Sequence, residues 1–299
     1  MKKLFLAVFF GLIALVLLAL ILSFAFSSAF PGLTGEIAVI PIKGEITASN
    51  TAFSSSMTST QIAEKIKEAD KDPLIKAIFL DIDSGGGSVV ATKEIVYSVR
   101  TAKKPVVAFI GETGASGAYY VAAASDLIVA DDDSLTGSIG VISVSANIEG
   151  LLEKLGIKMN VIKEGQFKDM GSSFRELTPE EQKLLSDLIS EVSVNFKKDV
   201  LEFRKNKISE TTFNSVADGR IISGRQAKQF GLIDFTGSRD FALQKTAELA
   251  GISGEPSLKY FDETSNDFFS AVSRMGYSFG TGFISAIKNS EAGFTLSAK

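Results

Sequence analysis

The stretch KAIFLDIDSGGGSVVATKEIVYSVRTAKKPVVAFI, residues 76–110, decides the fold class of this chain. It opens with a short and almost continuous apolar run, KAIFLDI, and closes with another, PVVAFI. Runs of this kind are typical of strands buried on both faces of a sheet. The segment between them, VVATKEIVYSVRTAKK, reads as a helix that ends before Pro105. The stretch therefore predicts a strand–helix–strand unit of a parallel sheet with a right-handed crossover.

The same alternation of strands and helices continues on both sides of this unit. Thr178 is a predicted N-cap, Pro179 occupies the first helical position, and Glu181 completes a capping box. The predicted strands are EIAVIPI, DLIVA, IGVISVSA and MNVIK, and the predicted helices cover residues 58–71, AYYVAAAS, 178 to about 204, and 240–250. This order predicts an α/β domain built in layers.

The N-terminal segment, residues 1–28, has the pattern of a membrane anchor. Lys2 and Lys3 precede an uncharged apolar run from Leu4 to Phe26. At about 1.5 Å per residue, such a run spans a bilayer core of about 30 Å. The position of the lysines predicts a cytoplasmic N-terminus, with the remainder of the chain outside the cytoplasm. Cleavage at the small residues 27–29 is the alternative.

A Pro-Gly linker, residues 29–35, leads into the compact domain, which we expect to cover residues 36–254. From residue 255 to 299 the chain is rich in Phe, Gly and Ser, with apolar residues about every three or four positions. This pattern fits an amphipathic segment that packs on a partner subunit, on the membrane surface or on the protein's own groove. It fits a frayed tail equally well, and both interpretations stay open.

The composition excludes several classes of chemistry. The chain has no histidine and no cysteine, which excludes Ser-His-Asp triads, HExxH zinc sites and thiolate nucleophiles. Its net charge of −4 argues against nucleic acid as a partner, because phosphate binding needs clustered basic residues. Any general base must therefore be a carboxylate, a lysine, a tyrosine or a terminal amine.

The segment DIDSGGGSV, residues 81–89, places three consecutive glycines between a buried strand and a helix. Glycines let the backbone turn sharply and lie close to a ligand, and the helix N-terminus offers unpaired N–H groups. The turn is neither a Walker motif nor a GxGxxG motif. It predicts an anion or oxyanion site, and a tight turn without a ligand is the alternative.

The segment GETGASGAYY, residues 111–120, places Ser116 among small residues. Ala118 stands where a GxSxG elbow has its second glycine, and we expect a loop of several residues between the strand and Ser116. The N–H of Gly117 and the glycine turn can together supply the two donors that an oxyanion needs. The alternative is that Ser116 only caps the following helix.

The residues alone leave the base for Ser116 open. Glu112 is close in sequence, Asp131–Asp133 form an acidic turn, and Lys168 lies in the loop EGQFKDMGSSF. The acidic turn is typical of a solvated loop, and its spacing does not fit an EF-hand calcium site. A lysine acts as a base at neutral pH only when its surroundings lower its pKa from about 10.4.

Several ordered segments together resemble a known family. They are IAVIPIKGEI, DIDSGGGSV, GASGAYYVAAASDLIVAD, LTGSIGVI, GQFKDMGSSFRELTPEE and ADGRIISGRQAKQFGLID, and they extend from about Glu36 to Gly251. The chain resembles the short form of the SppA signal peptide peptidases, membrane-anchored serine proteases. The resemblance implies a ClpP/crotonase-like fold of repeated ββα layers behind one N-terminal transmembrane helix.

The resemblance also implies residue roles and partners. Ser116 would be the nucleophile and Lys168 the general base of a Ser-Lys dyad, with the Ser138 hydroxyl orienting the lysine. Gly87 and Gly117 would be the oxyanion donors, and Gly86 would shape the same turn. Gly85 departs from the proline usual in the family, so that the turn should be less stiff.

We therefore expect a membrane-bound endopeptidase that needs no cofactor and no metal. Its substrates would be remnant signal peptides or other short hydrophobic peptides. The family forms homo-oligomeric rings in which neighbouring subunits can complete a dyad. An NfeD-type Ser-Lys protease, a crotonase-like acyl-CoA enzyme and a catalytically silent scaffold remain alternatives.

Overall fold

The computed structural model describes residues 15, 17, 18, 35–49 and 56–261. The predicted anchor and linker lie almost wholly outside the described residues, as does the tail beyond residue 261. Among the residues that are described, no helix combines the length and the apolar character needed to cross a membrane.

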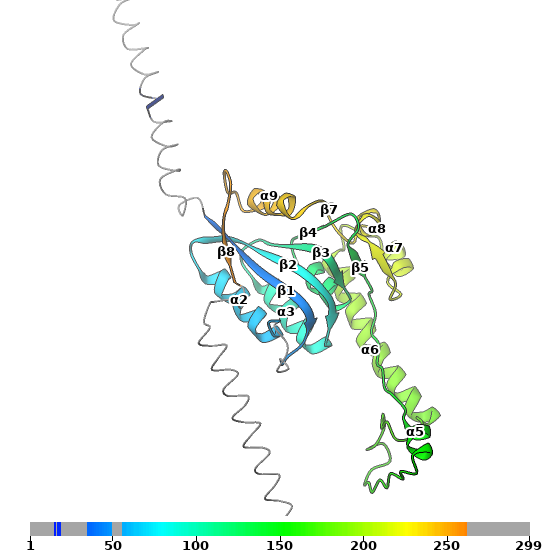
Figure 1. Ribbon diagram of the computed structural model, residues 1–299. Helices are drawn as coiled ribbons and strands as arrows, with labels where there is room; N and C mark the ends of the chain where they lie inside the picture. Colours follow the sequence, from blue (N-terminus) through cyan, green and yellow to red (C-terminus); the bar gives the residue numbers. More distant parts are fainter. Residues whose placement is uncertain (1–14, 16, 19–34, 50–55, 262–299) are drawn as a thin grey trace, which may run out of the picture.

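An eight-stranded sheet forms the centre of the protein (Figure 1). Its main path runs in the order β6-β5-β3-β2-β1-β8. The strands are β1 (Glu36–Ile46), β2 (Ile75–Gly87), β3 (Val106–Ala115), β4 (Leu127–Ala130), β5 (Leu135–Gly137), β6 (Ile221–Ser223), β7 (Phe235–Thr236) and β8 (Ser257–Tyr260). The pairs are parallel except β5–β6. Strand β3 pairs first with β4 and then, at its carboxyl end, with β5, so that it joins two parts of the sheet.

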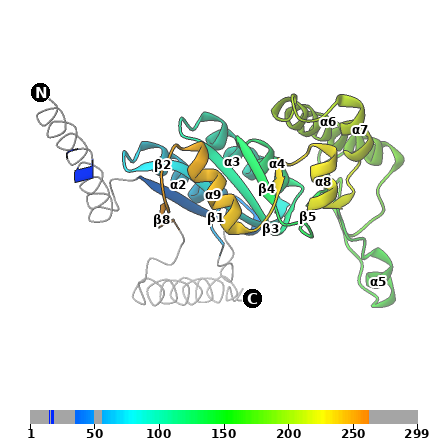
Figure 2. The same ribbon diagram turned by 90° about the horizontal axis from the view of Figure 1, so that it is seen from above.

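Helices cover both faces of the sheet (Figure 2). Helices α2, α3 and α4 lie on one face and α9 on the other. Their bounds are α2 (Ser59–Lys71), α3 (Val89–Thr101), α4 (Gly117–Ala123) and α9 (Arg239–Leu249), and the remaining helices are α5 (Glu149–Lys154), α6 (Pro179–Phe203), α7 (Glu210–Val216) and α8 (Gly224–Phe230).

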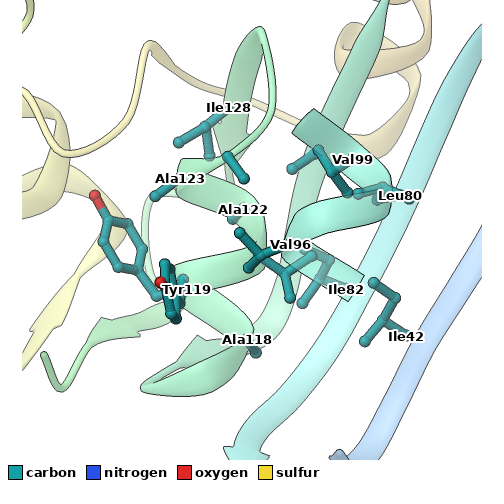
Figure 3. Close-up of a cluster of buried hydrophobic side chains, with 14 of the residues drawn as sticks. Ile42, Leu80, Ile82, Val96, Val99, Ala118, Tyr119, Ala122, Ala123 and Ile128 are labelled. Atoms are coloured by element: carbon teal, nitrogen blue, oxygen red, sulfur yellow. The ribbon is translucent and has the colours of Figure 1, made fainter. Parts of the chain in front are cut away.

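The core follows the two-residue period of the strands. In β1, Ile40 faces the α2–α4 side of the sheet and Val39 faces the α9 side, and both are buried. Strand β2 repeats the pattern, with Leu80 on the first side and Phe79 on the second. In Figure 3, Val96 of α3 lies among the β2 and α4 side chains of the first side. The sequence prediction of strands buried on both faces is confirmed.

The predicted helices are found, and the capping box at Thr178 forms as expected. The Thr178 side chain accepts a hydrogen bond from the Glu181 N–H, while the Glu181 carboxylate accepts one from the Thr178 N–H. Strand β3 is longer than the apolar run PVVAFI. It continues to Ala115 because residues 113–115 pair with β5, which leaves no loop between the strand and Ser116.

Two predicted strands are wrong for the single chain. IGVISVSA and MNVIK carry no strand in the described structure, because no neighbouring backbone pairs with them there. The compact domain also extends past the expected boundary at residue 254. Strand β8, which falls in the segment assigned to the tail, pairs with residues 36–39 of β1.

Residues 141–178, which we call the arm, project away from the sheet. The arm leaves near β5, includes α5 and returns at the N-terminal end of α6 (Figures 1 and 2). Its apolar side chains are unusually exposed: Ile142 and Val144 are both 85% exposed and Ile162 is 100% exposed. The sequence MNVIK and Lys168 both lie within the arm.

Candidate active site

A cavity of about 370 Å³ lies where β2 and β3 end. Because the two strands are parallel neighbours, their carboxyl ends meet at one edge of the sheet, where sites in α/β proteins gather. Four of the predicted site residues line this cavity: Gly87, Ser116, Gly117 and Ser138. Gly86 does not line the cavity but packs against the backbone of Gly117 and the side chain of Ser116. The structure thus brings together residues that are up to about 50 positions apart in the sequence.

Ser116 connects the end of β3 directly to α4. Its backbone has φ 51° and ψ −121°, a conformation that L side chains rarely adopt and that costs about 1–3 kcal/mol. Ser116 occupies the N-cap position of α4, but its side chain makes no capping hydrogen bond. The hydroxyl is therefore not used as a helix cap, which removes the purely structural alternative. The strained strand–serine–helix geometry is closer to a nucleophile elbow than the sequence indicated.

The glycines pack the two turns against each other. A Cβ added to Gly117 would lie 3.3 Å from the backbone nitrogen of Gly87, and one added to Gly86 would lie 2.6 Å from the nitrogen of Gly117. A Cβ on Gly87 would lie only 2.1 Å from the Ile46 carbonyl oxygen. The absence of side chains thus lets the Gly87 and Gly117 backbones approach closely, as two convergent oxyanion donors require.

Ser138 is held beside Ser116 by the backbone of β5. The Ser116 N–H donates to the Gly137 carbonyl at 2.9 Å, and the Ser138 N–H donates to the Arg220 carbonyl at 2.8 Å. Ser138 has φ 50°. In the described part of the chain, Ser116 and Ser138 are the two residues other than glycine with positive φ. Strain of this kind clusters at functional sites, and here both instances line one cavity.

The candidate bases are not beside Ser116. Glu112 and Asp131–Asp133 do not line the cavity, and neither does Lys168, which is exposed in the arm. The cavity does contain Tyr120, whose hydroxyl donates a hydrogen bond to Asp199. Burial and then this carboxylate raise the pKa of the Tyr120 phenol, so it stays neutral and cannot serve as a base.

An ion-pair network fixes the loop that carries Lys168. The Arg175 guanidinium binds Asp169 at 2.8 Å and Glu181 at 2.5 Å, and so ties this loop to the first turn of α6. Lys163 binds Asp169 as well, at 2.5 Å. The hydrogen bond from Arg175 lowers the pKa of Glu181 to about 2, and the same guanidinium lowers that of Asp169. Both carboxylates are therefore ionised at neutral pH.

The sequence did not reveal the remaining cavity residues. Val192 and Phe196 come from one face of α6, and the Tyr120 ring packs at a tilt against Phe196, with ring centroids 4.6 Å apart. Lys93 and Asp218 supply the charged part of the lining. Tyr120, Val141 and Asp218 lie in segments quoted above, but nothing there pointed to the cavity, whereas Lys93 follows Val89 by four residues and so shares a helix face with it.

The sequence matches the model of peptidase family S49 over residues 98–253. A Methanocaldococcus jannaschii protein with a protease name is 39% identical over 219 residues, which cover 73% of this chain and 70% of that protein. The chain belongs to peptidase family S49. The chloroplast serine protease SPPA of Arabidopsis thaliana is 34% identical over 227 residues, which cover 72% of this chain and 33% of that protein.

Membership of family S49 makes this chain a serine peptidase of the SppA type, as the sequence resemblance implied. A membrane-bound stomatin-specific protease has a similar structure, with a TM-score of 0.51 and 16% identity over 77% of this chain and 99% of that one. At this identity the likeness concerns the fold alone, a mixed α/β architecture. The observed fold agrees with the α/β domain that the sequence predicted.

Proposed function

We propose that this S49 peptidase cleaves peptides with Ser116 as nucleophile and with Lys168 of a neighbouring subunit as general base. One observation carries the proposal: a single cavity holds the strained Ser116, Gly87, Gly117 and Ser138, while Lys168 lies in an arm that projects from the same chain. Without histidine in the chain, a lysine supplied by a second copy would complete the site.

The surface of the arm supports such an assembly. Besides Ile142, Val144 and Ile162, it exposes Leu151, Leu155, Ile157, Met159 and Val161. Apolar side chains gathered on one projecting element are typical of an interface between proteins. A second copy would cover them and, in a closed ring, each arm would reach the next subunit. We propose in addition that the domain has the ClpP/crotonase-like arrangement of repeated ββα layers.

The proposed chemistry uses these groups in turn. Neutral Lys168 Nζ takes the proton of Ser116 Oγ as this oxygen attacks the carbonyl carbon of the peptide. The N–H groups of Gly87 and Gly117 stabilise the oxyanion, and the Ser138 hydroxyl orients the amine. The lysine ammonium then protonates the leaving amine, and water, activated by the same lysine, hydrolyses the acyl-enzyme.

The substrates that suit this cavity are short hydrophobic peptides, including remnants of signal peptides. Its wall includes Val89, Val141, Val192 and Phe196, which can hold an apolar side chain. The apolar N-terminal run would anchor the enzyme in the cell membrane, with the catalytic domain outside the cytoplasm. There the enzyme would meet peptides released from the bilayer.

Mixing two inactive variants tests this proposal. Ser116→Ala and Lys168→Ala are each expected to lose peptidase activity while folding normally. Co-expressed in equal amounts, they form sites that take Ser116 from one subunit and Lys168 from its neighbour. Random assembly leaves about one site in four with both groups, so about a quarter of the wild-type kcat should return.

The controls separate the parts of the proposal. A fluorophosphonate probe should label the wild-type protein and not Ser116→Ala. Label that persists in Ser116→Ala would remove Ser116 as nucleophile, and full activity of Lys168→Ala would remove Lys168 as base. If both variants are inactive but their mixture stays inactive although the subunits co-assemble, the dyad lies within one subunit.

A further inference from the structure

Among the described residues, one charged group in the cavity beside Ser116 forms no ion pair. Lys93 lines the cavity from the second turn of α3, one helical turn beyond Val89. Within the described residues, the Lys93 ammonium takes part in no ion pair and no side-chain hydrogen bond. Most surface lysines need no partner, but this one lines the same cavity as the strained serine.

The acidic groups near Lys93 are occupied elsewhere. Asp218, the carboxylate in the cavity lining, accepts hydrogen bonds from Arg220 at 2.6 Å and 2.8 Å. Those bonds lower the pKa of Asp218 to about 2, so that its charge is present but already paired. Glu94, next to Lys93 in the sequence, accepts hydrogen bonds from Ser59 and Thr60 of α2. Neither carboxylate bonds the Lys93 ammonium in the described structure, so this ammonium is available to a ligand in the cavity.

Two further features give this cavity the character of a site for a polar, negatively charged group. The first turn of α3 contains no acidic residue, and Ser88 makes no side-chain capping bond there, so the positive end of the helix dipole is not offset. The Thr92 hydroxyl, on a residue only 1% exposed, has no hydrogen-bond partner in the described structure. It lies 2.6 Å from the position of a Cβ on Gly117.

We propose that the cavity selects peptides that carry a carboxylate next to the scissile bond, and that Lys93 binds this carboxylate. The methylene groups of a glutamate would pack on Val89 and Phe196, and its carboxylate would meet the ammonium at the edge of the cavity. A free C-terminal carboxylate, one residue beyond the scissile bond, presents the same chemistry. The inference rests on the proposed function of Ser116 and adds a preference within its substrates.

The test uses the full-length enzyme and fluorogenic peptides that differ at the two residues flanking the scissile bond. Each position holds in turn Leu, Gln, Glu or Lys, and each peptide is made with a C-terminal amide or a free acid. In the wild-type enzyme, kcat/KM for Glu at one of these positions should exceed that for the isosteric Gln about tenfold, as expected for a charged hydrogen bond. An advantage confined to the free-acid peptides would identify the C-terminal carboxylate as the ligand.

Charge reversal makes the test specific to Lys93. In Lys93→Gln the ratio of kcat/KM between Glu and Gln peptides should fall to about one, and in Lys93→Glu a Lys-containing peptide should become preferred. Lys76→Gln, which removes another exposed lysine outside the cavity, should keep the wild-type ratio. The inference would be overturned if the Glu-to-Gln ratio of kcat/KM were equal in the wild type and in Lys93→Gln. It would also be overturned if Lys93→Gln folded normally but turned over none of the peptides, because Lys93 would then act in catalysis. Absence of turnover and of Ser116 labelling in the wild type would instead refute the proposed function.

Discussion

Replacing Gly86 by alanine should disable the site while Gly85→Ala, one residue earlier, leaves it intact. Gly86 has φ 100°, and its Cβ would lie 2.6 Å from the Gly117 nitrogen and 2.9 Å from the Ala115 carbonyl oxygen. Both neighbours are backbone atoms, which cannot rotate away. The Gly117 nitrogen is the group that we assign to the oxyanion, so relief of the clash must move that donor.

The size of the effect follows from two separate costs. A residue other than glycine at this φ loses about 1–3 kcal/mol of stability, before the clash is added. Displacing one oxyanion donor lowers kcat by about 10²–10³-fold, equivalent to about 2.7–4 kcal/mol in the transition state. Gly85 is exposed, has ordinary φ, and a Cβ there would meet nothing within 4 Å. Gly85→Ala should therefore change the stability by about 0.5 kcal/mol or less.

The assay compares kcat on a fluorogenic peptide with the free energy of unfolding in urea for both variants. Gly86→Ala should still fold, with a lower midpoint, and its kcat should fall far more than its folded fraction explains. Gly85→Ala should keep kcat close to that of the wild type, because its Cβ displaces no neighbouring atom. Wild-type kcat in folded Gly86→Ala would refute the reasoning, because the Gly117 N–H could not then be the group stabilising the oxyanion.

Two other changes test the surroundings of the site. Arg175→Ala should release the Lys168 loop from α6 and lower kcat by up to about 100-fold, because Lys168 is then misplaced, with little change in the free energy of unfolding of the core. The control Lys183→Ala removes an exposed ion pair on α6 and should leave kcat unchanged. Equal kcat in both variants would contradict the positioning role of Arg175. Asp234→Asn should lower the free energy of unfolding by about 3–5 kcal/mol at pH 7, because it leaves the buried Arg204 without its carboxylate. Burial raises the pKa of Asp234, but the hydrogen bonds and charge of Arg204 outweigh burial and hold this pKa below its usual value. The stability that the pair contributes is therefore present above about pH 3.9 and is lost as the pH falls through the native pKa. In urea titrations the gap between the wild type and Asp234→Asn should therefore close in acid, and a gap that stays constant would exclude the pair as its source.

The sequence predicted what depends on local pattern. Apolar runs such as KAIFLDI gave the buried strands, and the capping box at Thr178 gave the start of α6, because both signals arise from neighbouring residues. The pairing of Ser116 with the glycine turn was also accessible, since parallel strands end at one edge. What the pattern lacked was long-range contact: Phe196 reaches the cavity only because α6 packs against α4.

The strained backbone of Ser116 shows a second limit of sequence reasoning. Ala118 in place of glycine argued against an elbow, and the end of the apolar run at Ile110 suggested a loop before the serine. In the structure, β5 pairs with residues 113–115 and carries the strand up to Ser116. The pairing of residues 113–115 with the short strand β5 thus leads the chain directly into the strained backbone of Ser116. No local propensity contains that information.

The arm accounts together for the two wrong strands and for the isolated position of Lys168. IGVISVSA and MNVIK have strand composition, yet in one chain they lie unpaired with apolar side chains such as Ile142 and Ile162 exposed. Unpaired backbone and exposed apolar surface are both unfavourable, and a partner's backbone would remove both penalties at once. In the proposed ring, the same contact that pairs these segments would bring a neighbour's Lys168 to Ser116. The strand composition of these two segments would then reflect the assembled enzyme, because selection acts on the state in which catalysis occurs. The single chain would show only the part of the site that it builds alone.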